Sequence, residues 1–146
     1  VLENDIGVSA EVVKQLMSGE IPMYPRIGFP VVDVRDVARC HILAMTTPEA
    51  AGERFVCAGD FLWFEDIGRI VQEAYPDRKL PKRRMPNWLV RFAAIFNSAL
   101  AQTLEDLGRV MSVAHAKATR FLGWKPGPAR ETVLATAESL IERKIV

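Results

Sequence analysis

The stretch VVDVRDVARCHILAM, residues 31–45, constrains the fold of this chain more than any other segment. Its apolar beginning, with the proline before it, predicts a buried strand over PVVDV (residues 30–34). Asp36 stands where a helix N-cap belongs, and the residues after it carry apolar side chains at helical spacing. The expected inward stripe of that helix is Val37, His41, Ala44 and Met45. A strand that turns directly into a helix predicts an α/β or α+β protein.

Strand and helix patterns continue to alternate along the chain. A second buried strand is expected over ERFVCAG (residues 53–59). Helices are expected at 9–19 with Ser9 as N-cap, at 64–75, at 87–100 with Asn87 as N-cap, at 112–124 with Gly123 as the stop, and at 128–144. Their inward residues are expected to be Val12, Val13, Leu16 and Met17, then Ile67, Ile70, Val71 and Ala74, and finally Val133, Ala137, Leu140 and Ile141. Because helix exceeds strand, the chain is predicted to be helix-rich with short strands.

Composition places the chain among ordinary soluble globular domains. It has 146 residues, of which 49% are apolar and 25% charged, and a net charge of +1. This balance favours neither nucleic acid nor a membrane as a partner, and the longest uncharged stretch, residues 92–104, is too short and polar to span a bilayer. Cys40 and Cys57 form no Cys-x-x-Cys motif, which favours free thiols in the reducing cytoplasm over a disulfide.

No residue pattern in the chain predicts catalysis, metal binding or dinucleotide binding. The nine glycines lack the spacings of a phosphate-binding loop, and His41 and His115 have no second ligand at metal-site spacing. Tyr75 and Lys79 have the spacing of a Tyr-x-x-x-Lys pair, in which the lysine lowers the tyrosine pKa for proton transfer. Such a pair needs one helix face, and Pro76 ends the helix at Tyr75. We therefore interpret the match as a coincidence.

Two further clusters have more than one interpretation. The basic residues Lys79, Lys82, Arg83 and Arg84 would suit phosphate contacts of a nucleic-acid site, although a solvated basic strand edge is the favoured interpretation. The segment 87–100 is apolar nearly all round, with Trp88, Phe92, Ile95 and Phe96 at helical spacing. Core packing is the favoured interpretation of that stripe. Because the helix is apolar nearly all round, we also expect some of its surface to face a substrate, another lobe or a partner chain.

Three segments, taken in order, resemble one known family. They are VVDVRDVARCHILAM (31–45), AAGERFVCAG (50–59) and KATRFLGWKPGPARETVLATAESLIE (117–142). Together they are similar to the C-terminal third of extended short-chain dehydrogenases/reductases, of the dihydroflavonol-4-reductase-like, NAD-dependent epimerase/dehydratase type. The segment RKLPKRRMPNWLVRF (78–92) also looks like that family's link into its substrate-lobe helix. The resemblance implies that residues 1–146 form the mixed α+β substrate-binding lobe of an α/β, Rossmann-fold enzyme.

The same resemblance implies what this sequence leaves out. The family binds NAD or NADP through a Gly-x-x-Gly-x-x-Gly turn and uses Ser and a Tyr-x-x-x-Lys pair, all in an N-terminal Rossmann domain. We expect that domain to belong to the same protein, before Val1, and to pair its sheet edge with the strand at 53–59. The intact protein is then expected to be a cytoplasmic oxidoreductase, with a homodimer as one arrangement, that moves a hydride between nicotinamide and a carbonyl or alcohol carbon, and this chain alone should be inactive. A non-catalytic dinucleotide sensor or interaction module on the same fold is the alternative.

The substrate contacts expected in this lobe are mostly apolar. They are Met23, Tyr24, Met85, Trp88, Phe92 and Phe96, and for each of them ordinary core packing is the alternative. Arg35 is the polar candidate, because the strand-to-helix corners of α/β folds tend to face ligands. A plain salt bridge with Asp33 or a neighbouring acid is its alternative role. No catalytic, cofactor-binding or metal-binding residue is assigned within the chain.

Overall fold

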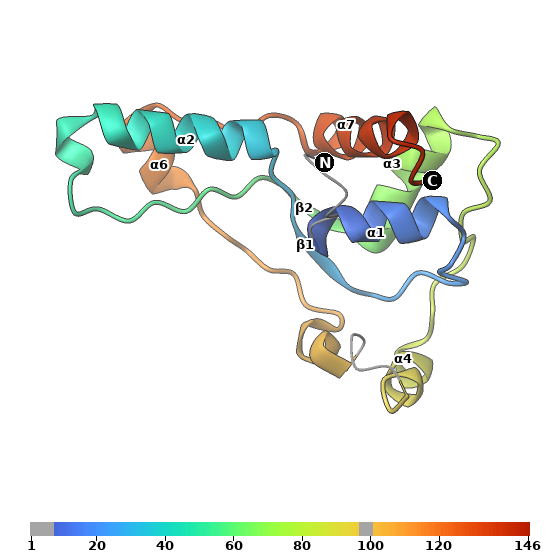
Figure 1. Cartoon of the computed structure of the whole chain (residues 1–146). Coiled ribbons are helices and arrows are strands. Elements are labelled where there is room, and N and C mark those ends of the chain that lie inside the picture. The colour runs from blue at the N-terminus through green and yellow to red at the C-terminus, as the bar shows by residue number, and fades with distance from the viewer. Residues whose placement is uncertain (1–7, 97–100) are drawn as a thin grey trace.

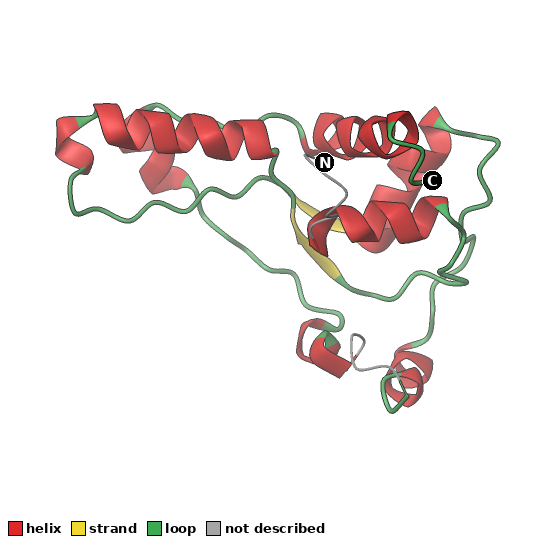
Figure 2. Cartoon of the chain, in the orientation of Figure 1, coloured by secondary structure: helices red, strands yellow, loops and turns green. Residues whose placement is uncertain are grey.

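The chain folds mainly into short helices joined by long loops. A computed structural model describes residues 8–96 and 101–146 (Figure 1). Its helices and strands are α1 (Val8–Met17), β1 (Gly28–Pro30), α2 (Val34–Thr46), η1 (Pro48–Ala50), β2 (Phe61–Trp63), α3 (Phe64–Ala74), α4 (Asn87–Ala93), η2 (Leu104–Asp106), α6 (Ala116–Leu122) and α7 (Ala129–Glu142). Residues 51–60 and 107–115 carry neither helix nor strand (Figure 2), so the predicted helix-rich chain with short strands is confirmed. In the described part, no helix is long and apolar enough to cross a membrane.

The main core lies where α1, α3 and α7 pack against one another (Figure 1). Its fully buried side chains include Leu16, Ile67, Val71 and Leu140. The inward face predicted for the last helix is confirmed, with Val133 and Ala137 buried and Ile141 half-buried. Ala74 is exposed, contrary to the prediction, because α3 ends at this residue. Helical spacing alone was therefore enough to find most of this core.

The two strands form a small antiparallel sheet in which Gly28 pairs with Trp63 and Pro30 with Phe61. The strand positions predicted from the sequence, 30–34 and 53–59, are wrong. β1 ends at Pro30, after which the N–H of Val31 donates to the carbonyl of Asp60 at 2.9 Å. The backbone N–H groups of residues 54–59 donate to no described residue, so this strand-like sequence lacks a neighbouring strand to pair with.

A second, smaller core joins α2, η1 and α6. Its buried residues are Cys40, Ala50, Ala118, Leu122 and Trp124. The inward stripe predicted for α2 is wrong for His41 and Met45, which are exposed, Met45 by 86%, while Asp36 and Cys40 are buried instead. Val37 and Ala44 of the predicted stripe are half-buried, and Ala44 packs against this core. The cause is that α2 packs only along a narrow strip, where Asp36 forms hydrogen bonds with a distant segment. The outer apolar face of α2 is left without a covering element in the described chain.

The predicted N-caps of three helices are wrong. Asp33 rather than Asp36 caps α2, and its carboxylate accepts the backbone N–H of Arg35 at 2.7 Å. α1 begins at Val8, so Ser9 lies within its first turn instead of preceding it. Pro86 occupies the N-cap of α4, ahead of Asn87. Each difference is a shift of one to three positions, which the periodicity of the apolar residues does not resolve.

The ends of two later helices differ in how well they were predicted. α4 ends at Ala93, and residues 94–96 form turns, so it is shorter than the helix expected over 87–100. Positions 97–100 of that expected helix lie outside the described residues. α6 ends at Leu122 with Gly123 as its C-cap, so the predicted stop is confirmed, and the φ of 64° at this glycine lies in the left-handed region that glycine adopts without strain. Its start at Ala116 is four residues later than the helix expected over 112–124.

Candidate functional site

The corner between β1 and α2 holds the ion pair of Asp33 and Arg35. The Arg35 Nε donates to Oδ1 of Asp33 at 2.9 Å, and its Nη2 donates to Oδ2 at 2.6 Å. These hydrogen bonds hold the pKa of Asp33 below its ordinary value. The salt bridge considered as the alternative role of Arg35 is therefore confirmed. Arg35 is also exposed beside a small cavity of about 340 Å³, and its contact with a substrate stays a prediction.

Asp36 connects the first turn of α2 to the loop that follows α6. Its carboxylate Oδ2 accepts the backbone N–H of Gly127 at 2.7 Å, and Oδ1 accepts from the Arg39 guanidinium. Its main-chain carbonyl accepts the indole N–H of Trp124 at 2.7 Å. Asp36 is 5% exposed, so this carboxylate has a structural role within the fold.

The aromatic residues of α4 lie on the surface. Trp88, Phe92 and Phe96 are exposed by 70%, 57% and 79%, and the rings of Phe92 and Phe96 meet edge to face at 5.7 Å. On the other side of the same helix, Val90 and Ala94 are buried. α4 itself is set apart from the helical core (Figure 1). The favoured interpretation of the aromatic stripe as core is therefore wrong, since Ile95 is also 72% exposed, whereas the outward apolar surface expected for part of this segment is confirmed.

A parallel bridge between Tyr24 and Arg84 brings other predicted site residues together. The backbone N–H of Met85 donates to the carbonyl of Tyr24 at 2.8 Å. Met23 and Met85 are both half-buried beside this bridge, and the chain runs from Met85 directly into α4. The structure thus groups the two methionines and Tyr24 near the start of α4, whereas Arg35 lies at a separate corner.

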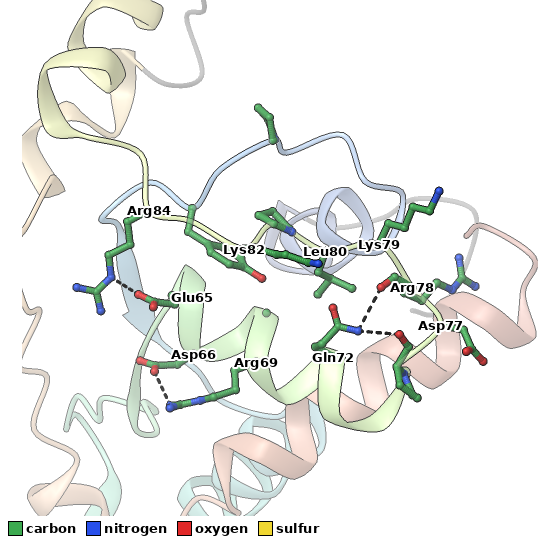
Figure 3. A pocket seen from close by; sticks show the side chains of 15 residues that line it. Glu65, Asp66, Arg69, Gln72, Asp77, Arg78, Lys79, Leu80, Lys82 and Arg84 are labelled. Atoms are coloured by element: carbon green, nitrogen blue, oxygen red, sulfur yellow. Dashed lines mark hydrogen bonds and ion pairs between the residues drawn. The ribbon is translucent and has the colours of Figure 1, made fainter.

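A mixed-charge groove of about 980 Å³ lies between α3 and the segment 76–84 (Figure 3). Tyr24 lines it and is only 6% exposed. The ring of Tyr24 lies directly on Gly68, where a Cβ would come within 2.3 Å of the phenol oxygen. Burial, and then the negative charge of Glu65, raises the pKa of Tyr24. The side chain of Tyr24 therefore belongs to this groove.

Tyr75 and Lys79 do not form a catalytic pair. α3 ends at Ala74, and Tyr75 follows as its C-cap with φ −129° and ψ 72°, outside the helical region. The Tyr75 side chain packs against the main core, while Lys79 lines the mixed-charge groove. The two side chains share no helix turn, which confirms the prediction made from Pro76.

The two thiols lie together in the smaller core. Cys40 is buried, Cys57 is half-buried, and both are free. Burial and contact with Cys57 raise the pKa of Cys40 to about 11. A thiol that stays protonated at neutral pH is a poor nucleophile, so Cys40 does not suit covalent catalysis. Within residues 8–96 and 101–146, no three His, Cys, Asp or Glu side chains gather as a metal site.

Comparison with known proteins shows what the chain is similar to. A cinnamoyl-CoA reductase of Medicago truncatula is 31% identical over 143 residues, which are 98% of this chain and 38% of that protein. The NADPH-dependent methylglyoxal reductase of Saccharomyces cerevisiae is 25% identical over 142 residues, which are 97% of this chain and 38% of that protein. The crystal structure of gox2253 matches with a TM-score of 0.73 at 24% identity, covering 93% of this chain and 44% of that one. The chain belongs to the extended short-chain dehydrogenase/reductase family.

The resemblance carried by the three sequence segments is thus confirmed. A scan against protein-family models found no match to this chain. The chain spans about two fifths of the length of these relatives and corresponds to their C-terminal portion. Both Asp36 and its partner Trp124 lie in the segments that carried the resemblance, so the family pattern coincides with a buried hydrogen-bond network.

Two residues that shape the mixed-charge groove were not predicted from the sequence. Gly68 admits the Tyr24 ring against α3, and a glycine inside an otherwise regular helix pattern was the available signal. Gln72 donates from Nε2 to the carbonyls of Pro76 at 3.0 Å and Arg78 at 3.2 Å, which holds the loop after α3. Nothing in the local sequence marks Gln72 for this role.

Proposed function

We propose that this chain is the substrate-binding part of an NAD(P)H-dependent carbonyl reductase. The observation that carries the proposal is the match along 98% of the chain to a protein named as a cinnamoyl-CoA reductase. A second relative, matched along 97% of the chain, is named as an NADPH-dependent methylglyoxal reductase. Both names describe the reduction of a carbonyl group. We therefore infer the same reaction class for the protein to which this chain belongs.

The helix starts in the described part of this chain do not form the glycine-rich site of a dinucleotide pyrophosphate. Such a group binds where a glycine-rich turn and a helix N-terminus present free N–H groups. Two helix starts here carry carboxylates that already accept backbone N–H groups: Asp33 accepts an N–H at the start of α2, and Asp66 accepts the N–H of Trp63 at 3.2 Å before α3. We therefore assign the dinucleotide to a separate Rossmann domain of the same protein, and no catalytic residue to this chain.

Two features of the chain support such a neighbouring domain. The outer face of α2 exposes Val34, Ile42 and Met45 by 66%, 61% and 86%. The segment 54–59 carries a strand-like sequence with backbone N–H groups that donate to no described residue, and Val56 in it is 45% exposed. An apolar helix face beside an unpaired extended segment is suited to the edge of a sheet. We infer that the dinucleotide-binding domain packs there.

The apolar side of α4 is the proposed contact for the organic part of the substrate. Trp88, Phe92 and Phe96 present aromatic surface, and Met23 and Met85 add flexible thioether side chains where the chain enters α4. Ligand sites are mostly apolar with a few polar groups, which matches this composition. The reacting carbonyl would then lie at the boundary with the dinucleotide-binding domain.

A chimera tests this assignment. Residues 8–146 replace the matching part of the Medicago reductase, and reduction of an aromatic aldehyde is followed through NADPH oxidation. Trp88→Ala and Phe92→Ala should each raise KM by about fivefold to tenfold, because each removes buried apolar contact with the substrate, while NADPH affinity stays unchanged. Val110→Ala is the matched control, since Val110 is also apolar and 63% exposed but lies outside α4.

Two outcomes contradict the proposal. One is a chimera that binds NADPH but shows the same KM for the aldehyde with and without the α4 substitutions. The other does not depend on the chimera folding: the 146-residue chain alone is titrated with NADPH and followed by nicotinamide fluorescence. We expect no micromolar binding, and micromolar affinity would place the dinucleotide site within this chain.

A further inference from the structure

The groove between α3 and the segment 76–84 has the size of a small-molecule site, at about 980 Å³. One wall comes from α3, with Glu65, Asp66, Arg69 and Gln72, and the other comes from the extended segment, with Arg78, Lys79, Lys82 and Arg84 (Figure 3). No residue of α4 lines it, so the groove is separate from the proposed substrate contact. A function of the groove is therefore independent of the substrate contact proposed for α4.

The charges that line the groove do not cancel. Five cationic and three acidic residues line it, an excess of two positive charges. Arg84 is paired with Glu65, and Arg69 is paired with Asp66 at 2.8 Å. Lys79 and Lys82 form no ion pair with any described residue. Two exposed ammonium groups from residues that line the groove are thus left without a carboxylate partner among the described residues.

The hydroxyl of Tyr24 is a further polar group at the groove. Tyr24 is 94% buried, as its side chain is only 6% exposed, and it lines the groove from the side of Gly68. Its phenol oxygen forms no hydrogen bond with a described residue. The phenol oxygen is not a buried atom without a partner, since among the described residues that description fits Nδ1 of His115. It therefore opens to the groove, where a phenol can donate its proton to an anion.

The cationic wall is held in a fixed position relative to α3. Gln72 binds the carbonyls of Pro76 and Arg78, and Leu80 is buried at 6% exposure in the main core. Further along, the parallel bridge joins Arg84 to Tyr24. Because both ends of the segment are anchored, the ammonium groups between them lose less entropy on binding a ligand than they would on a free loop.

We propose that this groove binds a small phosphate-bearing molecule, whose oxygens accept hydrogen bonds from Lys79, Lys82 and the Tyr24 hydroxyl. A phosphate group carries nearly two negative charges at neutral pH, which matches the excess of positive charge in the groove. Glu65, Asp66 and Asp77 line the same groove and would repel the continuous backbone of a nucleic acid. The ligand is therefore a small molecule rather than a polynucleotide.

The test is a titration of the ¹⁵N-labelled chain with inorganic pyrophosphate, with sodium chloride at equal ionic strength as the reference. The backbone amides of Gly68, Gln72 and Leu80 should shift and saturate with pyrophosphate but not with chloride. The double variant Lys79→Met, Lys82→Met should weaken binding at least about tenfold, because it removes two charged donors. Lys125→Met is the matched control, since Lys125 is exposed and outside the groove, and it should bind as the unsubstituted chain does.

Tyr24→Phe separates a real site from general attraction to positive charge. It removes one oxygen and no charge, so binding should weaken about threefold or more while amides outside the groove stay in place. The proposal is overturned if the groove amides do not respond to pyrophosphate, or if the double lysine variant binds it undiminished. Equal affinity of Tyr24→Phe also overturns the assignment. An oligonucleotide that binds more tightly than pyrophosphate through the same amides would show that the ligand is a nucleic acid instead.

Discussion

The indole N–H of Trp124 donates a 2.7 Å hydrogen bond to the main-chain carbonyl of Asp36, 88 positions away in the chain. The same aspartate accepts the backbone N–H of Gly127 through its carboxylate. Trp124 is 1% exposed and Asp36 is 5% exposed, so both interactions are shielded from water. The first turn of α2 and the loop after α6 therefore form one buried unit, and this unit leads to two predictions.

Trp124→Phe should lower the free energy of unfolding by about 2 kcal/mol. The substitution keeps an aromatic ring but removes the hydrogen bond from the indole to the Asp36 carbonyl and leaves a gap where the larger ring system was buried, which together cost about 2 kcal/mol. Urea unfolding followed by circular dichroism gives the difference. Trp88→Phe is the control, because Trp88 is 70% exposed and its replacement should change stability by less than about 0.5 kcal/mol. Equal effects of the two substitutions would contradict the structural role of Trp124.

Asp36→Ala should destabilise the chain more than Asp33→Ala does. Loss of an N-cap costs about 1 kcal/mol, which is the expectation for Asp33. Asp36→Ala removes the acceptor of the Gly127 N–H and an ion pair with Arg39 at a buried position, so about 2–3 kcal/mol is expected. Thermal or urea unfolding of both variants decides the order. A larger effect at Asp33 would mean that the cap outweighs the buried network.

These two aspartates also show where sequence reasoning reached its limit. The helix after residue 33 was predictable from apolar spacing, as were the inward faces of α3 and α7, because those patterns are local. Which aspartate turns inward was not, since Asp36 is held by residues 88 and 91 positions further along. Strand 53–59 was predicted for the same local reason, yet a strand also needs a neighbour, and in the described chain it has none.

The ion pair of Asp33 and Arg35 predicts a loss of stability in acid. The hydrogen bonds from Arg35 hold the pKa of Asp33 below its ordinary value of 3.8. A group with a lowered pKa in the folded state stabilises the fold above its unfolded pKa, and this contribution disappears as the pH falls through the folded pKa. Stability should therefore decrease below about pH 4. Asp33→Asn keeps a capping side chain but does not titrate, so its urea midpoint should change less between pH 5 and pH 2. Parallel profiles of the two proteins would contradict the prediction.

Gly68→Ala should destabilise the chain, although alanine is normally favoured over glycine inside a helix by about 1 kcal/mol. A Cβ at this position would lie 2.3 Å from the phenol oxygen of Tyr24 and 2.5 Å from Cε1 of its ring. The clash should cost about 1–3 kcal/mol and so outweigh the helix preference. In a Tyr24→Leu background the clashing atoms are gone, and Gly68→Ala should become neutral or stabilising. If the sign of the effect on the urea midpoint does not change between the backgrounds, the contact is not the reason for the glycine.

The groove around Tyr24 was only partly visible in the sequence. The basic run from Arg78 to Arg84 was recognised, and a phosphate contact was one of its two interpretations. The position of Tyr24 over Gly68 was not predictable, because 44 positions separate them and no local pattern links them. Similarly, Arg35 was correctly identified as a corner residue with two alternative roles, and only the structure shows its pairing with Asp33.

The pair of thiols gives a last prediction, for alkaline pH. Burial, and then contact with Cys57, raises the pKa of Cys40 to about 11, from an ordinary value of 9.0. Because the folded chain holds this proton more tightly than the unfolded chain, its contribution to stability is complete below about pH 9 and disappears as the pH rises towards 11. Cys40→Ala lacks this titration, and at pH 8 it should be less stable because a buried side chain is shortened.

The measurement that checks this prediction is the difference in urea midpoint between the unsubstituted chain and Cys40→Ala at several pH values. The gap should narrow between about pH 9 and 11, since only the unsubstituted chain loses the Cys40 contribution. Iodoacetamide at pH 8 should label the half-buried Cys57 before the buried Cys40. A gap that stays constant across this range would show that Cys40 releases its proton equally easily in the folded and unfolded chains. Faster labelling of Cys40 would lead to the same conclusion, because its thiol would then be neither protected nor held in the protonated form.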